Sequence, residues 1–171
     1  MNTTLETPHI DAELATTQDE HASLRLWLRL LSCTATIERH VRERLRVRFD
    51  TTLARFDMMA QLNREPRGLK MTELSRRLMV TGGNVTGLTD QLVAEGLVVR
   101  RQIPGDRRAY NVRLTPKGKR QFDAMAVEHE RWIIDLLDGI PADERGALYE
   151  ALGHLKSAMV ARLATVPAVH P

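Results

Sequence analysis

Residues 72–118 read TELSRRLMVTGGNVTGLTDQLVAEGLVVRRQIPGDRRAYNVRLTPKG, and the prediction of the fold rests first on this stretch. Its first half predicts two short helices joined by a tight turn, because Thr81 can cap the second helix and Gly96 can end it. Its second half places β-prone residues on both sides of a Pro-Gly turn, which predicts a β-hairpin. Thr115 and Pro116 then suit the first positions of another helix. The stretch therefore predicts a helix–turn–helix followed by a hairpin.

Long helices are predicted on both sides of this stretch. Residues 20–49 contain no Gly or Pro and repeat apolar residues at helical spacing, and Thr52 can cap a shorter helix behind them. A helix from Pro116 to about Asp138 and a last helix opened by Pro141 complete the chain. The predicted class is mainly α: a winged helix–turn–helix with long N- and C-terminal dimerisation helices and one β-hairpin wing.

The same pattern predicts how the chain is divided. We expect a flexible N-terminal arm, a pair of dimerisation segments, a winged helix–turn–helix lobe between them and a short tail. The arm is residues 1–18 and the tail is residues 166–171. The dimerisation segments are residues 19–50 and 116–165, and the lobe is residues 51–115.

Charge is concentrated in the middle of the chain. The net charge of the 171 residues is +3, yet residues 60–120 hold 13 Lys and Arg against 5 Asp and Glu, a net of +8. Residues 1–59 sum to −1 and residues 121–171 to −4. A basic middle of this kind favours a polyanionic partner. Aromatic residues are only 4% of the chain, which argues against stacking on single strands and favours double-stranded DNA.

Several other classes of protein are disfavoured. No apolar run reaches the roughly 18 residues of a membrane-spanning helix, and the N-terminus lacks the pattern of a signal peptide, so a cytoplasmic protein is expected. The single cysteine, Cys33, excludes an internal disulfide framework. No catalytic or cofactor motif is present, so we expect neither an enzyme nor a cofactor. A metal site at Glu128, His129 and Glu130 is a weaker alternative to a half-buried structural histidine.

Residues 72–118 resemble the DNA-binding region of the MarR (multiple-antibiotic-resistance regulator) family, in particular where LVAEGLVVRR is followed by GDRRAYNVRLTPKG. The lengths and order of the flanking helices extend the resemblance to about residues 20–165. The resemblance implies an obligate homodimer, operator DNA as partner and, in many members, a small-molecule effector. A twofold dimer would suit a pseudo-palindromic operator.

The helix after Thr81 is the candidate recognition helix. Asn84 and Gln91 lie off its apolar face and can pair with adenine through two hydrogen bonds. Its glycines either loosen the turn or allow the backbone to approach the bases, at a cost to helix stability of about 1 kcal/mol each. The expected DNA-binding residues of the helix–turn–helix are Thr81, Gly82, Gly83, Asn84, Thr86 and Gln91, with Arg76 and Arg77 as phosphate contacts.

The hairpin tip is the candidate minor-groove contact. In the family's D-x-R pattern the arginine enters the minor groove, and this position matches Arg108, with Asp106 orienting it. Arg107 would contact a phosphate. The alternative is a surface ion pair without function. Further phosphate contacts are expected among the remaining basic residues of the region, Arg100, Arg101, Arg113 and Lys117.

An effector site is the least specified part of the sequence. The family places it between the dimer helices and the DNA-binding lobe, and the turn MVTGGNVTGL resembles members that respond to aromatic acids or their coenzyme A (CoA) thioesters. Candidate lining residues are Arg25, Trp27, Arg55, Met58 and Met59, with ordinary core packing as the alternative. Two other functions stay open: a redox-sensing repressor that uses Cys33, although its leucine neighbours predict a buried thiol, and an architectural DNA-binding protein without an effector.

Overall fold

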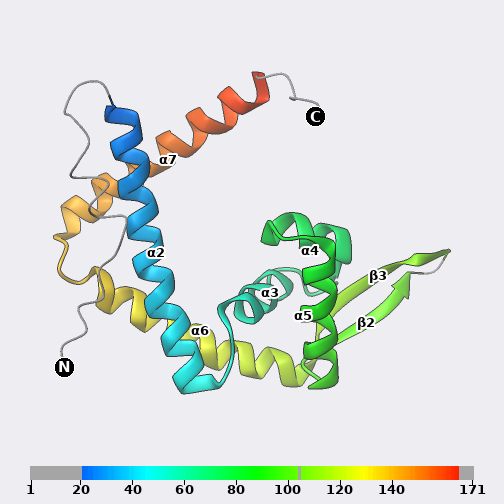
Figure 1. The fold of residues 1–171 in the computed structure, drawn as a ribbon. Helices are drawn as coiled ribbons and strands as arrows, with labels where there is room; N and C mark the ends of the chain where they lie inside the picture. The colour runs from blue at the N-terminus through cyan, green and yellow to red at the C-terminus, as the bar shows by residue number, and fades with distance from the viewer. Residues whose placement is uncertain (1–20, 104, 166–171) are drawn as a thin grey trace, which may run out of the picture. The chain divides into compact units, whose positions relative to one another are not determined.

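A computed structural model describes residues 21–103 and 105–165, without the side chains of residues 106–108. It confirms the mainly helical class and the predicted order of elements (Figure 1). The predicted arm and tail (1–18 and 166–171) lie outside the described residues. The elements are α2 (Ala22–Phe49), α3 (Leu53–Asn63), β1 (Leu69–Lys70), α4 (Met71–Leu78), α5 (Gly82–Ala94), β2 (Val98–Ile103), β3 (Asp106–Leu114), α6 (Pro116–Leu137) and α7 (Ala142–Thr165).

The chain forms two compact units, Met1–Trp132 and Ile133–Pro171. The first unit contains the core, built where α2, α3, α4, α5, the sheet and the first part of α6 contribute apolar side chains. Its fully buried side chains include Leu45, Met58, Met59, Leu62, Leu74, Val85, Leu92, Leu97, Val112 and Met125. The second unit consists of the end of α6 and α7, and α7 has no buried residue.

The predicted caps are confirmed. The hydroxyl of Thr52 accepts a hydrogen bond from the backbone N–H of Arg55 (3.3 Å), and Thr81 does the same for Asn84 (3.4 Å). Thr115 caps α6 by accepting from the N–H of Gly118 at 3.0 Å. Because each cap satisfies a backbone donor that has no partner inside its helix, these threonines fix where the helices begin.

Gly96 ends α5 as predicted. Its φ is +69°, and its N–H donates to the carbonyl of Val93 while the N–H of Leu97 donates to that of Leu92, both at 2.9 Å. This is the Schellman arrangement, which turns the chain directly from the helix into β2.

The sheet has three antiparallel strands in the order β1-β3-β2, one strand more than the predicted hairpin. The additional strand, β1, is only two residues long and pairs Leu69 with Val112. Gly68 precedes it at φ +89°, where a Cβ would lie 2.0 Å from Oδ1 of Asn111. The side-chain amide of Asn111 in turn donates to the carbonyl of Arg67 at 3.1 Å. These contacts attach the wing to the segment between α3 and α4.

Two features of the long helices differ from expectation. Cys33 is exposed, so the prediction of a buried thiol is wrong for the single chain, although Leu30, Leu31 and Ile37 around it are half-buried. Trp132, which was not predicted as core, is only 4% exposed and lies 6.3 Å from the ring of Phe49.

Candidate nucleic-acid interface

Helix α5 has one buried and one exposed face. Val85, Thr89 and Leu92 are buried, and Leu88 is half-buried beside them. All six residues predicted to read DNA from this segment are exposed: Thr81, Gly82, Gly83, Asn84, Thr86 and Gln91. The sequence prediction missed Thr89, whose hydroxyl donates to the carbonyl of Val85 at 2.7 Å inside the core. The buried residues hold α5 in the core, and the six candidate DNA-binding residues on its other face and at its N-cap take no part in this packing.

The three glycines of α5 are not required by packing. A Cβ added to Gly82, Gly83 or Gly87 would meet nothing within 4 Å. The hydroxyl of Thr86 donates to the carbonyl of Gly82 at 3.0 Å, so it is held along the helix surface. The bare backbone at these positions leaves room for a close partner, which is one of the two uses of glycine that the sequence suggests.

The wing consists of β2 and β3. Val98 pairs with Leu114 at its base and Ile103 pairs with Asp106 at its end, where Gly105 has a φ of +85°. Three predicted contact residues, Asp106, Arg107 and Arg108, begin β3, but their side chains lie outside the described part of the structure. The minor-groove contact therefore stays a prediction.

Arg100 connects the wing to the recognition helix. Its guanidinium forms an ion pair with Asp90 of α5 at 2.9 Å and lies over the ring of Tyr110 at 5.1 Å. The sequence suggested a phosphate contact for Arg100. Its position between α5 and both wing strands makes it a residue that orients the wing.

Arg76 and Arg77 share the carboxylate of Glu73. Arg76 contacts it at 2.7 Å and Arg77 at 2.6 Å, and these two guanidiniums lower the pKa of Glu73 from 4.5 to about 2. Arg77 is further paired with Glu65 at 3.1 Å and is largely covered, so the prediction that it contacts phosphate is not supported by its surroundings. The side chain of Arg76 is 73% exposed, so its guanidinium is accessible to a DNA phosphate.

Arg55 and Lys117 both reach the end of α5. Arg55 of α3 forms an ion pair with Glu95, and Lys117 of α6 donates to the carbonyl of Glu95 at 2.8 Å. These contacts hold α3 and α6 against the recognition helix. Arg55 therefore already has an anionic partner in the single chain, and its predicted role in an effector site stays a prediction.

The other predicted effector residues do not form one site. Met58 and Met59 are 0% and 1% exposed and belong to the core, because α3 turns this face toward α5 and the sheet. Trp27 is exposed on α2. Among the described residues, the hollow next to Arg25 is lined otherwise by three of its neighbours on α2, Ala22, Leu26 and Arg29.

The residues considered for a metal site have other partners. Glu128 pairs with Arg48 at 3.2 Å and Arg131 at 3.0 Å. His129 lies 4.9 Å from the ring of Phe56, and burial lowers its pKa below the usual 6.5. Among the described residues, no group of three or more His, Cys, Asp and Glu side chains could hold a metal ion. Within the same residues, every helix is too short or too polar to cross a bilayer.

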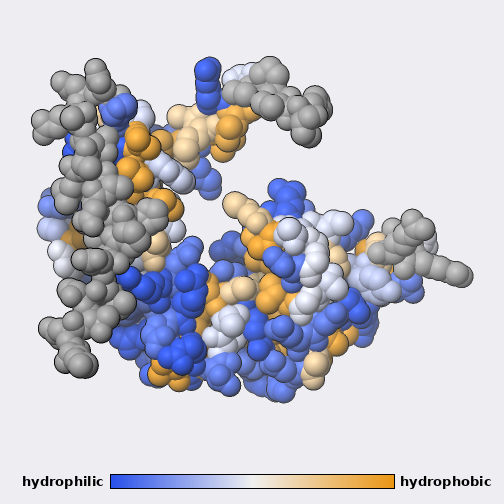
Figure 2. Space-filling model, in the orientation of Figure 1, coloured by the Kyte–Doolittle hydropathy of each residue, from blue (hydrophilic) through white to orange (hydrophobic). Residues whose placement is uncertain are grey.

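Apolar side chains remain exposed on the long helices. Figure 2 shows apolar surface over α7, where Leu148, Leu152, Met159 and Leu163 are between 40% and 72% exposed. Leu24, Leu26 and Trp27 are similarly exposed on α2. A single chain leaves both helices with apolar surface that a partner would have to cover.

A capped helix with an exposed first half, beside a wing of paired strands in a basic lobe, defines a winged helix–turn–helix protein of the DNA-binding class. Residues 49–109 match the model of the MarR family. The fold is similar to that of a MarR family transcriptional regulator from Silicibacter pomeroyi, with 30% identity, a TM-score of 0.72, and coverage of 84% of this chain and 99% of that one. The chain belongs to the MarR family.

Curated relatives point to the same family. An HTH-type transcriptional regulator of Bacillus anthracis is 30% identical over 128 residues, which are 74% of this chain and 84% of that protein. The HTH-type transcriptional repressor YetL of Bacillus subtilis is 30% identical over 98 residues, 57% and 59% of the two chains. With two further regulators of Bacillus subtilis, the match spans about half of the relative's length, 54% and 51%. These relatives are transcriptional regulators and not enzymes.

Proposed function

We propose that this chain is a ligand-responsive transcriptional regulator that binds a pseudo-palindromic operator as a homodimer and represses transcription. The observation that carries the proposal is the exposed face of α5, where Asn84 and Gln91 are free of core packing beside the wing. The net charge of +8 over residues 60–120 would attract the phosphate backbone to this face. The likeness to YetL, a transcriptional repressor of Bacillus subtilis, supports repression over activation.

Operator binding is tested by gel shift on the DNA upstream of the protein's own gene. Arg108→Ala should weaken operator binding by about 1–3 kcal/mol, whereas Arg107→Ala should cost less and reduce mainly the salt dependence. Arg44→Ala is the control, because Arg44 is exposed on α2 outside the lobe. Equal losses on operator and on unrelated duplex for Arg108→Ala would remove the minor-groove assignment.

The effector in this proposal is an aromatic carboxylate or its CoA thioester, which would release the operator. A ligand has this effect only if it binds the DNA-incompetent conformation more tightly. The support is the likeness of MVTGGNVTGL to members that respond to such compounds. Hydroxycinnamates and their CoA thioesters, added to the gel shift, are the test, and the absence of any release would remove this part of the proposal.

A second candidate, a redox-sensing repressor, is favoured by the exposure of Cys33. An exposed thiol can be oxidised, whereas a buried one is protected. Hydrogen peroxide should then release the operator from the wild type and not from Cys33→Ser. Release by an aromatic ligand with no response to peroxide favours the first candidate, and the reverse pattern favours the second.

A further inference from the structure

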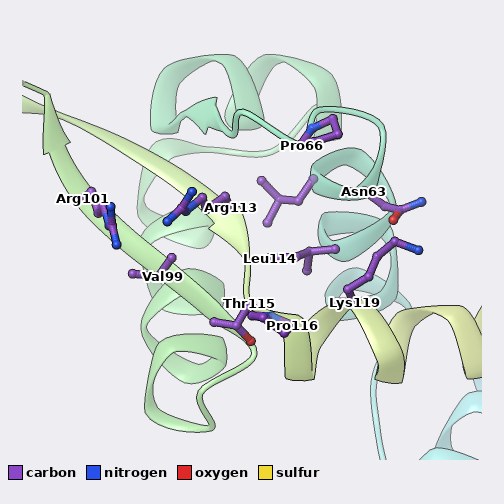
Figure 3. Close-up of a pocket in the computed structure, with 10 residues that line it drawn as sticks. Asn63, Pro66, Val99, Arg101, Arg113, Leu114, Thr115, Pro116 and Lys119 are labelled. Carbon is purple, nitrogen blue, oxygen red and sulfur yellow. The ribbon is translucent and has the colours of Figure 1, made fainter.

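A groove lies at the base of the wing (Figure 3). Its lining residues come from the end of α3 and the segment after it, from β2 and β3, and from the start of α6. Its volume is about 620 Å³. Its apolar lining comes from Leu62, Pro66, Val99, Leu114 and Pro116. A hollow of this size, largely apolar and with a few polar groups, has the dimensions of a small-molecule site.

The groove lies on the face of the wing that is turned away from the recognition helix. Arg100 points to α5, since it pairs with Asp90. Because successive side chains of a strand point to opposite faces, Val99 and Arg101 point the other way. Val99 is paired with Arg113 in the register of the sheet, so Arg113 shares this face. Arg101 and Arg113 are thus diagonal neighbours on one wall of the groove.

The charge of the groove has one sign. Of the residues that the structure describes, Arg101, Arg113 and Lys119 line it, and no carboxylate among them does. Lys119 is paired with Asp123 at 2.5 Å, but within the described residues neither Arg101 nor Arg113 forms an ion pair. Both arginines also line an adjoining hollow with Arg67. This contrasts with Arg55, Arg77 and Arg100 of the same unit, each of which has a carboxylate partner.

We infer that this groove binds a small organic anion, with its anionic group held between Arg101 and Arg113 and its apolar body on Val99, Leu114 and Pro116. Two adjacent guanidiniums repel each other until an anion lies between them, and a carboxylate or phosphate can accept hydrogen bonds from both. The apolar floor beside them distinguishes the site from a phosphate contact of DNA, which needs exposed cations and no hollow.

A ligand in this groove would contact the wing and the body of the lobe together. Arg101 and Arg113 belong to β2 and β3, whereas Pro66 follows α3 and Lys119 lies in α6. The ligand would therefore bias the position of the wing, and this regulatory consequence rests on the proposed function. Binding itself does not, and it is measured without DNA.

The test uses 4-fluorocinnamate as the probe, the full-length protein, and fluorine NMR titration. The neutral control is 4-fluorocinnamide, which has the same body without the charge. We expect the acid to bind roughly tenfold more tightly than the amide, and Arg101→Ala and Arg113→Ala each to weaken the acid by about the same factor. In proton–nitrogen spectra of the nitrogen-15-labelled protein, the amide resonances of Val99 and Leu114 should shift on titration. Arg120→Ala is the matched control, because Arg120 is exposed and next to Lys119 but does not line the groove.

Equal affinity for acid and amide, or unchanged affinity in both arginine variants, would overturn the inference. Shifts confined to α2 or α7 would do so as well. If the two variants weaken binding to unrelated duplex DNA and leave the probe unaffected, the groove is a phosphate contact surface instead. Val99→Phe, which occupies the groove without removing charge, should also abolish binding, and thermal unfolding of each variant shows that the fold is retained. Failure of operator binding in the gel shift leaves all these readouts unchanged.

Discussion

Gly118 and Gly87 are both helical glycines, yet they have opposite surroundings. A Cβ at Gly118 would lie 1.9 Å from the carbonyl oxygen of Leu97, which is itself fixed because it accepts a hydrogen bond from Thr115. Gly118→Ala should therefore lower the free energy of unfolding by about 1–3 kcal/mol or more, the cost of overpacking. Gly87→Ala should raise it by about 0.5–1 kcal/mol, since alanine favours helix and nothing obstructs it. Urea unfolding of both variants checks the difference, and a destabilised Gly87→Ala would contradict it.

The position of His129 against Phe56 predicts a pH dependence of stability. Because burial lowers the pKa of His129 below 6.5, the unfolded chain binds a proton at a pH where the folded chain does not. Stability should therefore fall as the pH drops through 6.5 toward the lower pKa of the folded state, and level off below it. His129→Phe keeps the ring contact and removes the titration. In this variant the free energy of unfolding, measured between pH 8 and pH 5, should no longer show the fall assigned to His129. A pH dependence equal to that of the wild type would contradict the assignment.

Local interactions at single residues could be predicted from the sequence, and distant ones could not. Thr52, Thr81 and Thr115 cap backbone groups three residues away, so the pattern alone identifies them. The burial of Thr89 depends on Met58 and Met71, which lie 31 and 18 residues away in the chain. No periodicity of α5 distinguishes such a threonine from an exposed one.

At the scale of elements, the ion pair between Arg55 and Glu95 connects α3 to the end of α5. Arg55 is the more buried partner, with 15% of its side chain exposed against 46% for Glu95. Glu95→Gln should therefore cost about 1–2 kcal/mol of unfolding free energy, because it leaves a covered charge without a partner, and Arg55→Met should cost less. Denaturant titrations of both variants provide the measurement. The reverse order would contradict this argument from the burial of Arg55.

The helices of the lobe could be located from the sequence because each has its own cap and apolar spacing. Strand β1 could not, since two residues carry no period and the strand exists only through its pairing with β3. The burial of the candidate effector residues on α3 could not be predicted for a related reason. An arginine or methionine on α3 has the same pattern whether it faces a cavity or the core, and only the packing of α5 against it decides.

At the scale of the whole molecule, the exposed apolar surface concerns assembly. Unit Met1–Trp132 encloses a core, whereas α7 buries nothing within the single chain. The sequence could predict that the long helices need a partner, because their apolar stripes exceed what one small lobe covers. It could not predict which side of α2 is covered by the rest of its own unit, so the exposure of Cys33 was not predicted.

The last prediction concerns the dimer that we propose for α7. The residues Leu148, Leu152, Met159 and Leu163 follow one another at spacings close to whole helical turns, so they form a stripe. Burying each leucine contributes about 1.5–3 kcal/mol to the free energy of association, and in a twofold dimer every position is buried once in each subunit. Leu152→Lys should therefore weaken dimerisation by far more than tenfold, as measured by sedimentation velocity over a range of concentrations.

Ser157→Lys is the matched control for this variant. It adds the same charge to α7 but lies about half a turn away from Leu155 and Met159, off the stripe. It should leave the dimer within a few-fold of the wild type. Because operator recognition needs two recognition helices held one turn of DNA apart, Leu152→Lys should also lose operator affinity while its binding to unrelated duplex stays near that of the control. A wild-type chain that sediments as a monomer at micromolar concentration would exclude the dimer, and with it the twofold operator.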